Sequence, residues 1–361
     1  MGIWLPTTEG DIDAEWLSAA LHDSSDAATA NRISQIRIRP VTSAVNLMGE
    51  VSRIFIDWDE SGARLPATVI AKLPSRNPEN RALGLGMGWY EAEHRFYRDL
   101  AAHVGLRIPA CLFTAADPDT GRYVVLLEDL ASLTRVDQLD GLDLARTERT
   151  IDALAAMHAR WWNNPQLPLV DWLPVGLGEP LRVFGQLMEL AWPQFVDATA
   201  DVLTDADRYV AERFVAGFDA IVDFTLDADW TLIHRDFRVD NMFFDGLDPV
   251  VFDWSTVGRG GAFYDVAYFL AGGLEIADRR LHWDRLLSRY VARLDEAGAV
   301  VADDGGLALR ANALSCLVVP ILTGGKVVDT LDARGWTFAA TMMRRTFALL
   351  HDLDAIAILD A

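Results

Sequence analysis

One short segment, residues 234–241, constrains the fold of this chain more than any other part of its sequence. It reads His-Arg-Asp-Phe-Arg-Val-Asp-Asn, and a short apolar run at 229–233 precedes it. Two strand-like runs with turn residues between them follow: 242–244, Gly246, Pro249 and 250–252. Short apolar runs separated by such residues are typical of a hairpin. The pattern predicts a strand, a polar loop and a hairpin, with Asn241 where the hairpin begins and Asp253 where it ends.

The polar residues of this segment suit phosphoryl transfer. The spacing H-R-D-x-x-x-x-N is the catalytic-loop pattern of kinase-like phosphotransferases. That chemistry needs a carboxylate that orients and deprotonates an attacking hydroxyl, which we assign to Asp236. It also needs oxygen ligands for Mg²⁺ on the nucleotide phosphates, which we assign to Asn241 and Asp253. A surface loop rich in aspartate would explain each residue alone but not their combination.

Lysine is rare in this chain, and this draws attention to Lys72. Of the 32 lysine and arginine residues only two are lysine, Lys72 and Lys326. Lys72 ends the apolar run 67–71, which reads as a buried strand. A compact ammonium can reach phosphate oxygens in a narrow cleft where a planar guanidinium fits poorly. We therefore expect Lys72 to hold the nucleotide phosphates, although two lysines must also fall somewhere by chance.

The partner of this lysine is predicted from helical periodicity. Residues 88–103 read as a helix, and Glu93 shares its face with apolar residues: Trp89, Phe96, Tyr97 and Leu100. Glu91 lines up instead with Arg95 on a charged face. A buried, unpaired carboxylate costs several kcal/mol, on the order-of-magnitude scale, so Glu93 needs a cationic partner. In kinase-like sites a glutamate of this helix pairs with the strand lysine, so we expect the pair to be Lys72 and Glu93.

Several further motifs give the chain a family resemblance. The matching pieces are Ala71-Lys72-Leu73, Glu93 with Phe96-Tyr97, Leu126-Leu127-Glu128-Asp129-Leu130, Leu154 to His158-Ala159, the loop 234–241, Asp253-Trp254, and Asp265-Val266-Ala267-Tyr268-Phe269. With these residues the chain resembles the aminoglycoside-phosphotransferase-like superfamily of small-molecule kinases, most of all its choline-kinase-like and ecdysteroid-kinase-like branch. The resemblance implies an α+β, protein-kinase-like bilobal fold. We expect a small N-lobe sheet with an N-terminal helix at 1–127 and a larger, mainly helical C-lobe at 128–361.

The resemblance also implies roles for further residues. Adenine of ATP would bond to the backbone of Glu128 and Leu130 in the hinge between the lobes. Arg238 could reach the transferred phosphoryl group and stabilise its charge, or it could face solvent. Asp265 would brace the catalytic loop, although capping the apolar helix that it heads is an equally simple role. His158 lies on an apolar helix face and is expected to be a packed core histidine.

Two departures from the family pattern concern the loops. Many members have glycine where Arg235 stands. The nucleotide loop at 42–49 holds one glycine, so a full glycine-rich phosphate clamp is not evident. The segment Gly258-Arg259-Gly260-Gly261 leaves little room for a long regulated activation loop, which disfavours a protein kinase.

Composition limits the partners and the location. The net charge of −21 argues against nucleic-acid partners, which need a basic surface. The start of the chain reads as a capped amphipathic helix without a secretory signal, and we expect no membrane span. Cys111 and Cys316 stand in separate apolar contexts and are expected to be reduced, which favours a cytoplasmic protein.

The phosphate acceptor is the least constrained part of the prediction. Residues 160–225 are rich in aromatic side chains: Trp161, Trp162, Trp172, Phe184, Trp192 and Phe195. They could line a pocket for a bulky, mostly apolar alcohol, or they could pack a helical subdomain. The sequence thus predicts an ATP- and Mg²⁺-dependent kinase of a small-molecule hydroxyl. The alternatives are a non-catalytic nucleotide-binding pseudokinase, an aminoglycoside-type antibiotic phosphotransferase, and a transferase of nucleotidyl groups.

Overall fold

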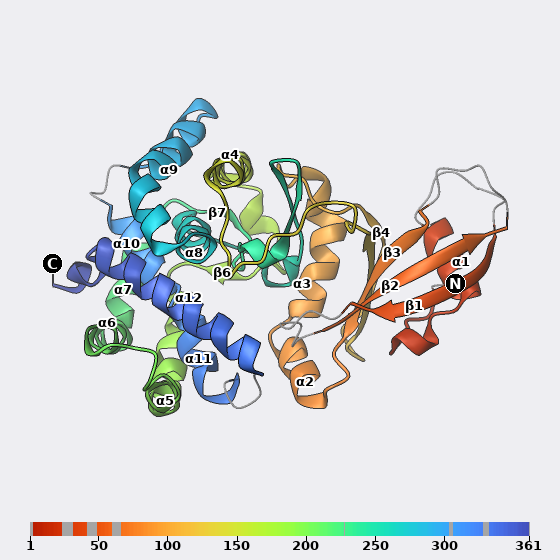
Figure 1. The fold of residues 1–361 in the computed structure, drawn as a ribbon, viewed down its shortest axis with the longest axis horizontal. Helices are drawn as coiled ribbons and strands as arrows, with labels where there is room; N and C mark the ends of the chain where they lie inside the picture. The colour runs from red at the N-terminus through yellow and green to blue at the C-terminus, as the bar shows by residue number, and fades with distance from the viewer. Residues whose placement is uncertain are drawn as a thin grey trace. The chain divides into compact units, whose positions relative to one another are not determined.

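The structure is a computed structural model, and it describes residues 3–23, 32–41, 49–59, 66–226, 228–302, 306–327 and 332–360. The chain forms two compact units. The first unit comprises residues 1–133 and 251–256, and the second comprises 134–250 and 257–361. Each unit is described separately below, with the helix and strand labels of Figure 1.

The first unit is built on a five-stranded antiparallel sheet with the order β1-β2-β3-β5-β4. Its strands are β1 (Ile33–Pro40), β2 (Gly49–Trp58), β3 (Thr68–Pro74), β4 (Cys111–Asp117) and β5 (Arg122–Glu128). Side chains alternate between the two faces of a strand. In β3 this alternation buries Val69, Ala71 and Leu73 in one core, and it turns Lys72 to the opposite face. Helix α1 (Ala14–Asp23) packs on that core through Trp16 and Leu17.

The predicted helix at 88–103 is helical from Trp89 onward but is not one regular α-helix. After α2 (Pro78–Gly86), α3 covers Trp89–Arg95, and the chain continues as a π-helical turn over Phe96–Leu100 and a 3₁₀ turn over Ala101–His103. Phe96 is fully buried, and its ring stacks on Trp254 at 4.1 Å with 4° between the planes. Wide turns of this kind occur frequently at functional sites.

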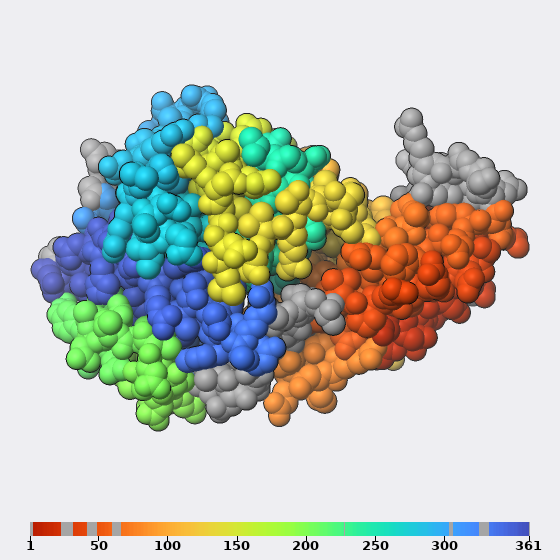
Figure 2. Space-filling view, in the orientation of Figure 1, coloured from red at the N-terminus to blue at the C-terminus, as the bar shows by residue number. Residues whose placement is uncertain are grey.

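The second unit is mainly helical. Its longer elements are α4 (Leu144–Trp161), α5 (Arg182–Ala198), α6 (Asp205–Ala216), α7 (Phe218–Leu226), α8 (Phe263–Gly273), α9 (Ile276–Glu296), α10 (Leu307–Ser315), α11 (Val318–Val327) and α12 (Ala333–Asp352). One buried cluster joins α5, α6, α7, α8, α10, α11 and α12. Figure 2 shows α5 to α7 in green beside α12 in blue on the visible face. Phe195 lies in this cluster, and Trp161 is also buried, so these two aromatic residues pack the helices instead of lining a pocket.

Short strands flank the loop 234–241 in the second unit. β7 (Thr231–Ile233) leads into the loop, and β8 (Met242–Asp245) and β9 (Asp248–Val251) form the hairpin that the sequence predicts. β10 (Gly258–Gly260) lies between β6 (Val175–Gly176) and β7 in a three-stranded sheet. The segment after the hairpin is therefore fixed by strand pairing on both sides.

One apolar stretch differs from the expectation that no segment is long enough to span a membrane. By length and composition, Leu307–Gly324 could do so, with a mean hydropathy of 1.6. In the structure the stretch is divided between α10 and α11, and 44% of it is buried.

Candidate active site

The first unit brings Lys72 between two carboxylates. Its Nζ lies 2.6 Å from Glu93 Oε1 and 3.0 Å from Asp253 Oδ1. Glu93 is 1% exposed, whereas Glu91 lies on the outer face of the helix and pairs with Arg95 at 2.8 Å. The ion pair expected from periodicity is therefore present, with the glutamate that the apolar face selects.

The charge of Lys72 follows from these contacts. Burial acts to lower the pKa of the ammonium, but the carboxylates of Asp253 and Glu93 act more strongly and raise the pKa above its ordinary value. Lys72 is therefore a permanent cation. Such a point charge can bind phosphate oxygens without any proton exchange with solvent.

Glu93 has a second partner that sequence reasoning missed. Tyr123 in β5 donates its hydroxyl to Glu93 Oε2 at 2.8 Å, so each oxygen of the carboxylate is engaged. The Tyr123 ring stacks on Tyr90 with centroids 5.0 Å apart, and Ser75 N donates to the Tyr90 hydroxyl at 3.2 Å. The hydroxyl of a tyrosine in a strand that is buried on both faces needs a polar partner. In the sequence, this need was the one indication that Tyr123 makes such a contact.

The predicted hinge is held by side chains on either side. Glu128 N donates to Ala110 O at 2.8 Å, and Ala110 N donates to the Glu128 carboxylate at 3.1 Å. Arg53 in β2 binds Asp129 with two bonds, Nε to Oδ2 at 2.7 Å and Nη2 to Oδ1 at 3.2 Å. Asp129 is 6% exposed at its side chain, and Leu130 is buried. Arg53 was not among the predicted residues, because nothing local relates it to residue 129.

Asp253 adopts an uncommon backbone conformation. Its φ is 65°, in the left-handed region that Asp and Asn tolerate better than most residues. Besides Lys72, its Oδ1 accepts a hydrogen bond from Ser255 Oγ at 2.9 Å. Strained backbone of this kind clusters at ligand-binding and catalytic sites, where the surrounding structure maintains it.

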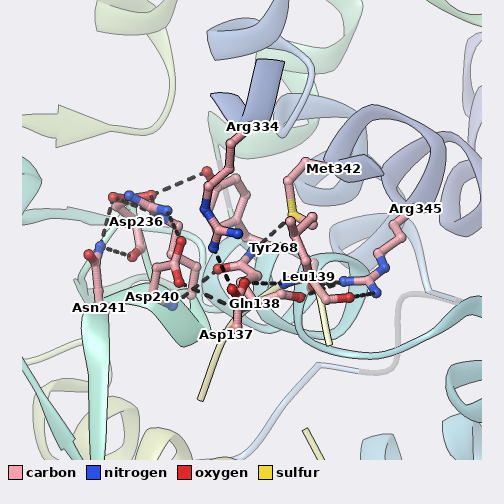
Figure 3. Close-up of polar contacts among 12 residues, drawn as sticks. Asp137, Gln138, Leu139, Asp236, Asp240, Asn241, Tyr268, Arg334, Met342 and Arg345 are labelled. Atoms are coloured by element: carbon pink, nitrogen blue, oxygen red, sulfur yellow. Dashed lines mark hydrogen bonds and ion pairs between the residues drawn. The ribbon is translucent and has the colours of Figure 1, made fainter. Parts of the chain in front are cut away.

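In the second unit, three donors converge on the carboxylate of Asp236 (Figure 3). Arg238 Nε lies 3.0 Å from each carboxylate oxygen. Asn241 Nδ2 donates to Oδ2 at 2.7 Å and to the Asp236 carbonyl at 2.9 Å, and the Tyr268 hydroxyl donates to Oδ1 at 3.2 Å. Arg238 was expected to contact the transferred phosphoryl group or to face solvent. Its side chain is 13% exposed and pairs with the acid itself. Tyr268 was part of a motif, but no contact to Asp236 was predicted for it.

Asp265 braces the backbone ahead of Asp236. Its carboxylate accepts hydrogen bonds from His234 N at 2.7 Å and from Arg235 N at 2.9 Å, and it is fully buried. It is the third residue of α8 and not its N-cap, so bracing is the role that the structure supports. His158 Nε2 lies 3.5 Å from this carboxylate and Nδ1 lies 2.7 Å from the Tyr290 hydroxyl, and the ring is fully buried, as expected for a core histidine.

Arg235 adopts a left-handed conformation, with φ of 66°. Glycine populates this region at little cost, so a glycine would fit the backbone at this position. The side chain of Arg235 passes close to Gly258, where an added Cβ would lie 3.0 Å from its Cδ. The missing side chain of Gly258 thus leaves room for this arginine.

The residues assigned to Mg²⁺ supply suitable ligand atoms. The Asn241 amide nitrogen is engaged by Asp236, which leaves the amide oxygen as the coordinating atom, and Asp253 offers a carboxylate. Mg²⁺ prefers such hard oxygens, and it is usually held by one or two of them together with substrate phosphates. Within the described part of the chain, no three His, Cys, Asp or Glu residues form a metal site by themselves. The nucleotide loop expected at 42–49 lies outside the described residues, except for Gly49.

Comparisons with known proteins identify the family. The model of the phosphotransferase enzyme family (APH) matches residues 88–303, which is more than half of the chain. A search of curated protein sequences found no significant match.

Solved structures share the fold at low sequence identity. Choline kinase from Cryptosporidium parvum Iowa II is 11% identical, with 96% of this chain and 98% of that chain covered and a TM-score of 0.59. Macrolide 2′-phosphotransferase from Brachybacterium faecium is 17% identical, with 91% and 97% covered and a TM-score of 0.51. An amicoumacin kinase, solved with AMP-PNP and Ca²⁺, is 14% identical, with 87% and 88% covered and a TM-score of 0.51. The predicted protein-kinase-like fold is confirmed, and the chain belongs to the phosphotransferase enzyme family.

Proposed function

We propose that this enzyme transfers the γ-phosphate of ATP to a hydroxyl group of a small molecule. The observation that carries the proposal is the environment of Asp236, whose carboxylate is oriented by Arg238, Asn241 and Tyr268. A carboxylate held in this way can align an alcohol for attack, and alignment together with charge stabilisation supplies most of the rate in phosphoryl transfer.

The proposed reaction forms one bond and breaks one bond at the γ-phosphorus. The acceptor oxygen attacks the γ-phosphorus, the bond from that phosphorus to the bridging oxygen of ADP breaks, and the hydroxyl proton passes to Asp236. Arg238 stabilises the negative charge on the transferred group. The products are a phosphate ester and ADP.

The remaining predicted residues bind the nucleotide in this proposal. Lys72 binds its phosphates, and Glu93 fixes the position of the ammonium. The backbone of Glu128 and Leu130 binds adenine. Asn241 and Asp253 hold Mg²⁺, which when bound neutralises charge on the phosphates.

The side chains around Asp236 favour an acceptor with an apolar or aromatic body. Tyr268 stacks on Tyr264 with centroids 6.0 Å apart and 8° between the planes. The Arg238 guanidinium lies 5.6 Å from the centre of the Phe338 ring. The nearby carboxylate of Asp240 is paired with Arg238. A polycationic aminoglycoside needs unpaired carboxylates, so we place a bulky, mostly apolar alcohol ahead of it as acceptor.

The location inside the cell remains part of the proposal. Cys111 and Cys316 are both free thiols, and burial raises the pKa of the Cys111 thiol to about 12. Cys316 is buried and Cys111 is partly buried, and unreactive thiols of this kind are compatible with the reducing cytoplasm. We therefore propose a cytoplasmic enzyme.

The test is mass spectrometry of a pool of small alcohols and host metabolites incubated with Mg-ATP. Wild type and Asp236→Asn are compared, with Asp201→Asn, an exposed position, as the matched control. We expect a phosphate-sized mass gain on one compound with wild type and Asp201→Asn, and none with Asp236→Asn. Normal turnover by Asp236→Asn would refute the assignment.

The same experiment separates the alternatives. An adenylyl-sized gain would indicate nucleotidyl transfer. ATP binding measured by calorimetry, without any product from the pool or from added aminoglycosides, would indicate a non-catalytic module. A gain on aminoglycosides alone, with protection of growing cells, would indicate an antibiotic phosphotransferase.

A further inference from the structure

A buried glutamine far from the loop 234–241 in the sequence contacts that loop in the second unit. Gln138 lies between the end of the first unit at residue 133 and the start of α4, and it is 2% exposed. Figure 3 shows its side chain among the segment 137–139, the loop around Asp236, and α12. Burying an amide is unfavourable unless its polar atoms find partners, so the contacts of Gln138 indicate what the position requires.

The backbone N–H groups of Gln138 and Asp240 each donate to a side-chain oxygen of the other residue. Asp240 N donates to Gln138 Oε1 at 3.2 Å, and Gln138 N donates to Asp240 Oδ1 at 3.4 Å. The glutamine thus holds both the backbone and the carboxylate of Asp240. Paired bonds of this kind fix a side chain in orientation as well as in distance.

The other oxygen of Asp240 faces Arg238. Arg238 Nη1 lies 3.4 Å from Asp240 Oδ2, while its Nε lies 3.0 Å from both oxygens of Asp236. Although burial acts to lower the pKa of Arg238, Asp236 and its other neighbours raise it, so the guanidinium stays charged. A continuous set of polar contacts therefore runs from Gln138 through Asp240 and Arg238 to Asp236.

Gln138 is itself held from the far side by α12. The side-chain Nε2 of Gln138 donates to Met342 Sδ at 2.9 Å, and its backbone carbonyl accepts from Arg345 Nη1 at 2.8 Å. Arg345 is 2% exposed, and it also donates to Gly272 O at 2.9 Å and Leu139 O at 2.9 Å. A Cβ on Gly272 would lie 2.8 Å from Gln138 Nε2, so the absence of a side chain there leaves space for the amide.

We propose that Gln138 is a positioning residue, which through Asp240 holds the Arg238 guanidinium against the carboxylate of Asp236. Reacting groups lose rate steeply when they are displaced by about 1 Å, so an anchor behind the loop has catalytic consequences. The catalytic part of this inference rests on the proposed function. The structural part, that Gln138 fixes Arg238, does not depend on it.

The structural part is tested in the enzyme without substrates. Hydrogen exchange at the Nε–H of Arg238 is followed by NMR in arginine-labelled protein, with the signal assigned by its loss in Arg238→Lys. Gln138→Met keeps the length of the side chain and removes both polar atoms. We expect exchange to accelerate by roughly three- to tenfold, the equivalent of one lost hydrogen bond. Gln186→Met, at an exposed position of α5, is the matched control and should leave exchange unchanged.

The catalytic part is tested by steady-state kinetics with the acceptor found in the screen. In Gln138→Met we expect kcat to fall about tenfold while the KM for ATP stays within about twofold, because the loss concerns the reacting groups and not nucleotide binding. Asp240→Asn, which keeps the volume of that side chain, should lower kcat similarly. The two changes combined should lower kcat no further than either alone, since the Gln138 side chain acts on Arg238 only through Asp240.

Each outcome decides the proposal. Unchanged Arg238 exchange in Gln138→Met, or a kcat of Gln138→Met equal to that of Gln186→Met, would overturn it. If Gln138→Met does not fold, Asp240→Asn decides alone, because it leaves Gln138 in place. If wild type phosphorylates no alcohol, the proposed function fails, and the exchange measurement still decides whether Gln138 fixes Arg238.

Discussion

Removing the hydroxyl of Tyr123 should weaken both the first unit and the proposed nucleotide site. The substitution Tyr123→Phe deletes one buried bond, from the tyrosine hydroxyl to Glu93 Oε2 at 2.8 Å, and leaves the ring stacked on Tyr90. Tyr123 is 2% exposed and Glu93 is 1% exposed, so no water replaces the lost donor. Hydrogen bonds to buried charged groups contribute about 1.5–3 kcal/mol, and we expect a loss of about 2 kcal/mol.

The assay combines thermal unfolding with calorimetric binding of Mg-ATP. For a chain of 361 residues, with an unfolding entropy of about 2.1 cal/mol/K per residue, a loss of about 2 kcal/mol corresponds to a fall in melting temperature of roughly 2–3 °C. We expect binding to weaken as well, because Glu93 without Tyr123 is free to turn away from Lys72. Tyr209→Phe, at a side chain that is 53% exposed, should change neither quantity and serves as the control.

A double-mutant cycle can refute the reasoning. In a Glu93→Gln background the bond is no longer assisted by charge, so Tyr123→Phe should cost only about 1 kcal/mol. An equal loss of stability in both backgrounds would mean that the hydroxyl does not act through the Glu93 carboxylate. Unchanged ATP affinity in Tyr123→Phe would show that Glu93 keeps its position without Tyr123.

Three more predictions follow from the described contacts. Asp152 lies in α4 and pairs with Arg289 and Arg293 of α9. Burial acts to raise the pKa of Asp152, but the two arginines lower it overall. The carboxylate therefore stabilises the fold above about pH 4, and less as the pH falls through the folded pKa. Asp152→Asn should thus lower the melting temperature at pH 7, with a difference that shrinks below pH 4. Asp265→Asn places an amide against a backbone N–H donor of the loop, so we expect kcat to fall at least about tenfold and stability by about 3 kcal/mol, measured by kinetics and urea unfolding. Arg235→Gly should leave stability within about 1 kcal/mol, whereas Arg235→Val should lower it by about 2 kcal/mol, because a β-branched residue tolerates a φ of 66° poorly.

Local patterns in the sequence predicted the fold class and much of the candidate site. The apolar face of residues 88–103 selected Glu93, and the apolar run 67–71 predicted the buried strand that carries Lys72. The turn residues predicted the β8–β9 hairpin. These features depend on residues close together in the chain, where the periods of helix and strand apply directly.

The missed contacts join residues that are distant in the sequence. Tyr123 and Glu93 are 30 residues apart, Arg53 and Asp129 are 76 apart, and Gln138 and Asp240 are 102 apart. No periodicity relates such positions, so each could be predicted only as a polar residue in need of a partner. The wide turn at Phe96–Leu100 was missed for another reason, since its apolar residues also fit a regular helix.

The ion pair between Arg238 and Asp236 has a consequence for the end of the reaction. In the free enzyme the guanidinium and the carboxylate, 3.0 Å apart, balance each other. In the proposed reaction, Asp236 becomes neutral when it takes up the acceptor's proton, and the positive charge of Arg238 would then be balanced by the newly formed phosphate ester. When this proton is lost, the Asp236 carboxylate pairs with Arg238 again and competes with the ester for the guanidinium, which assists departure of the product.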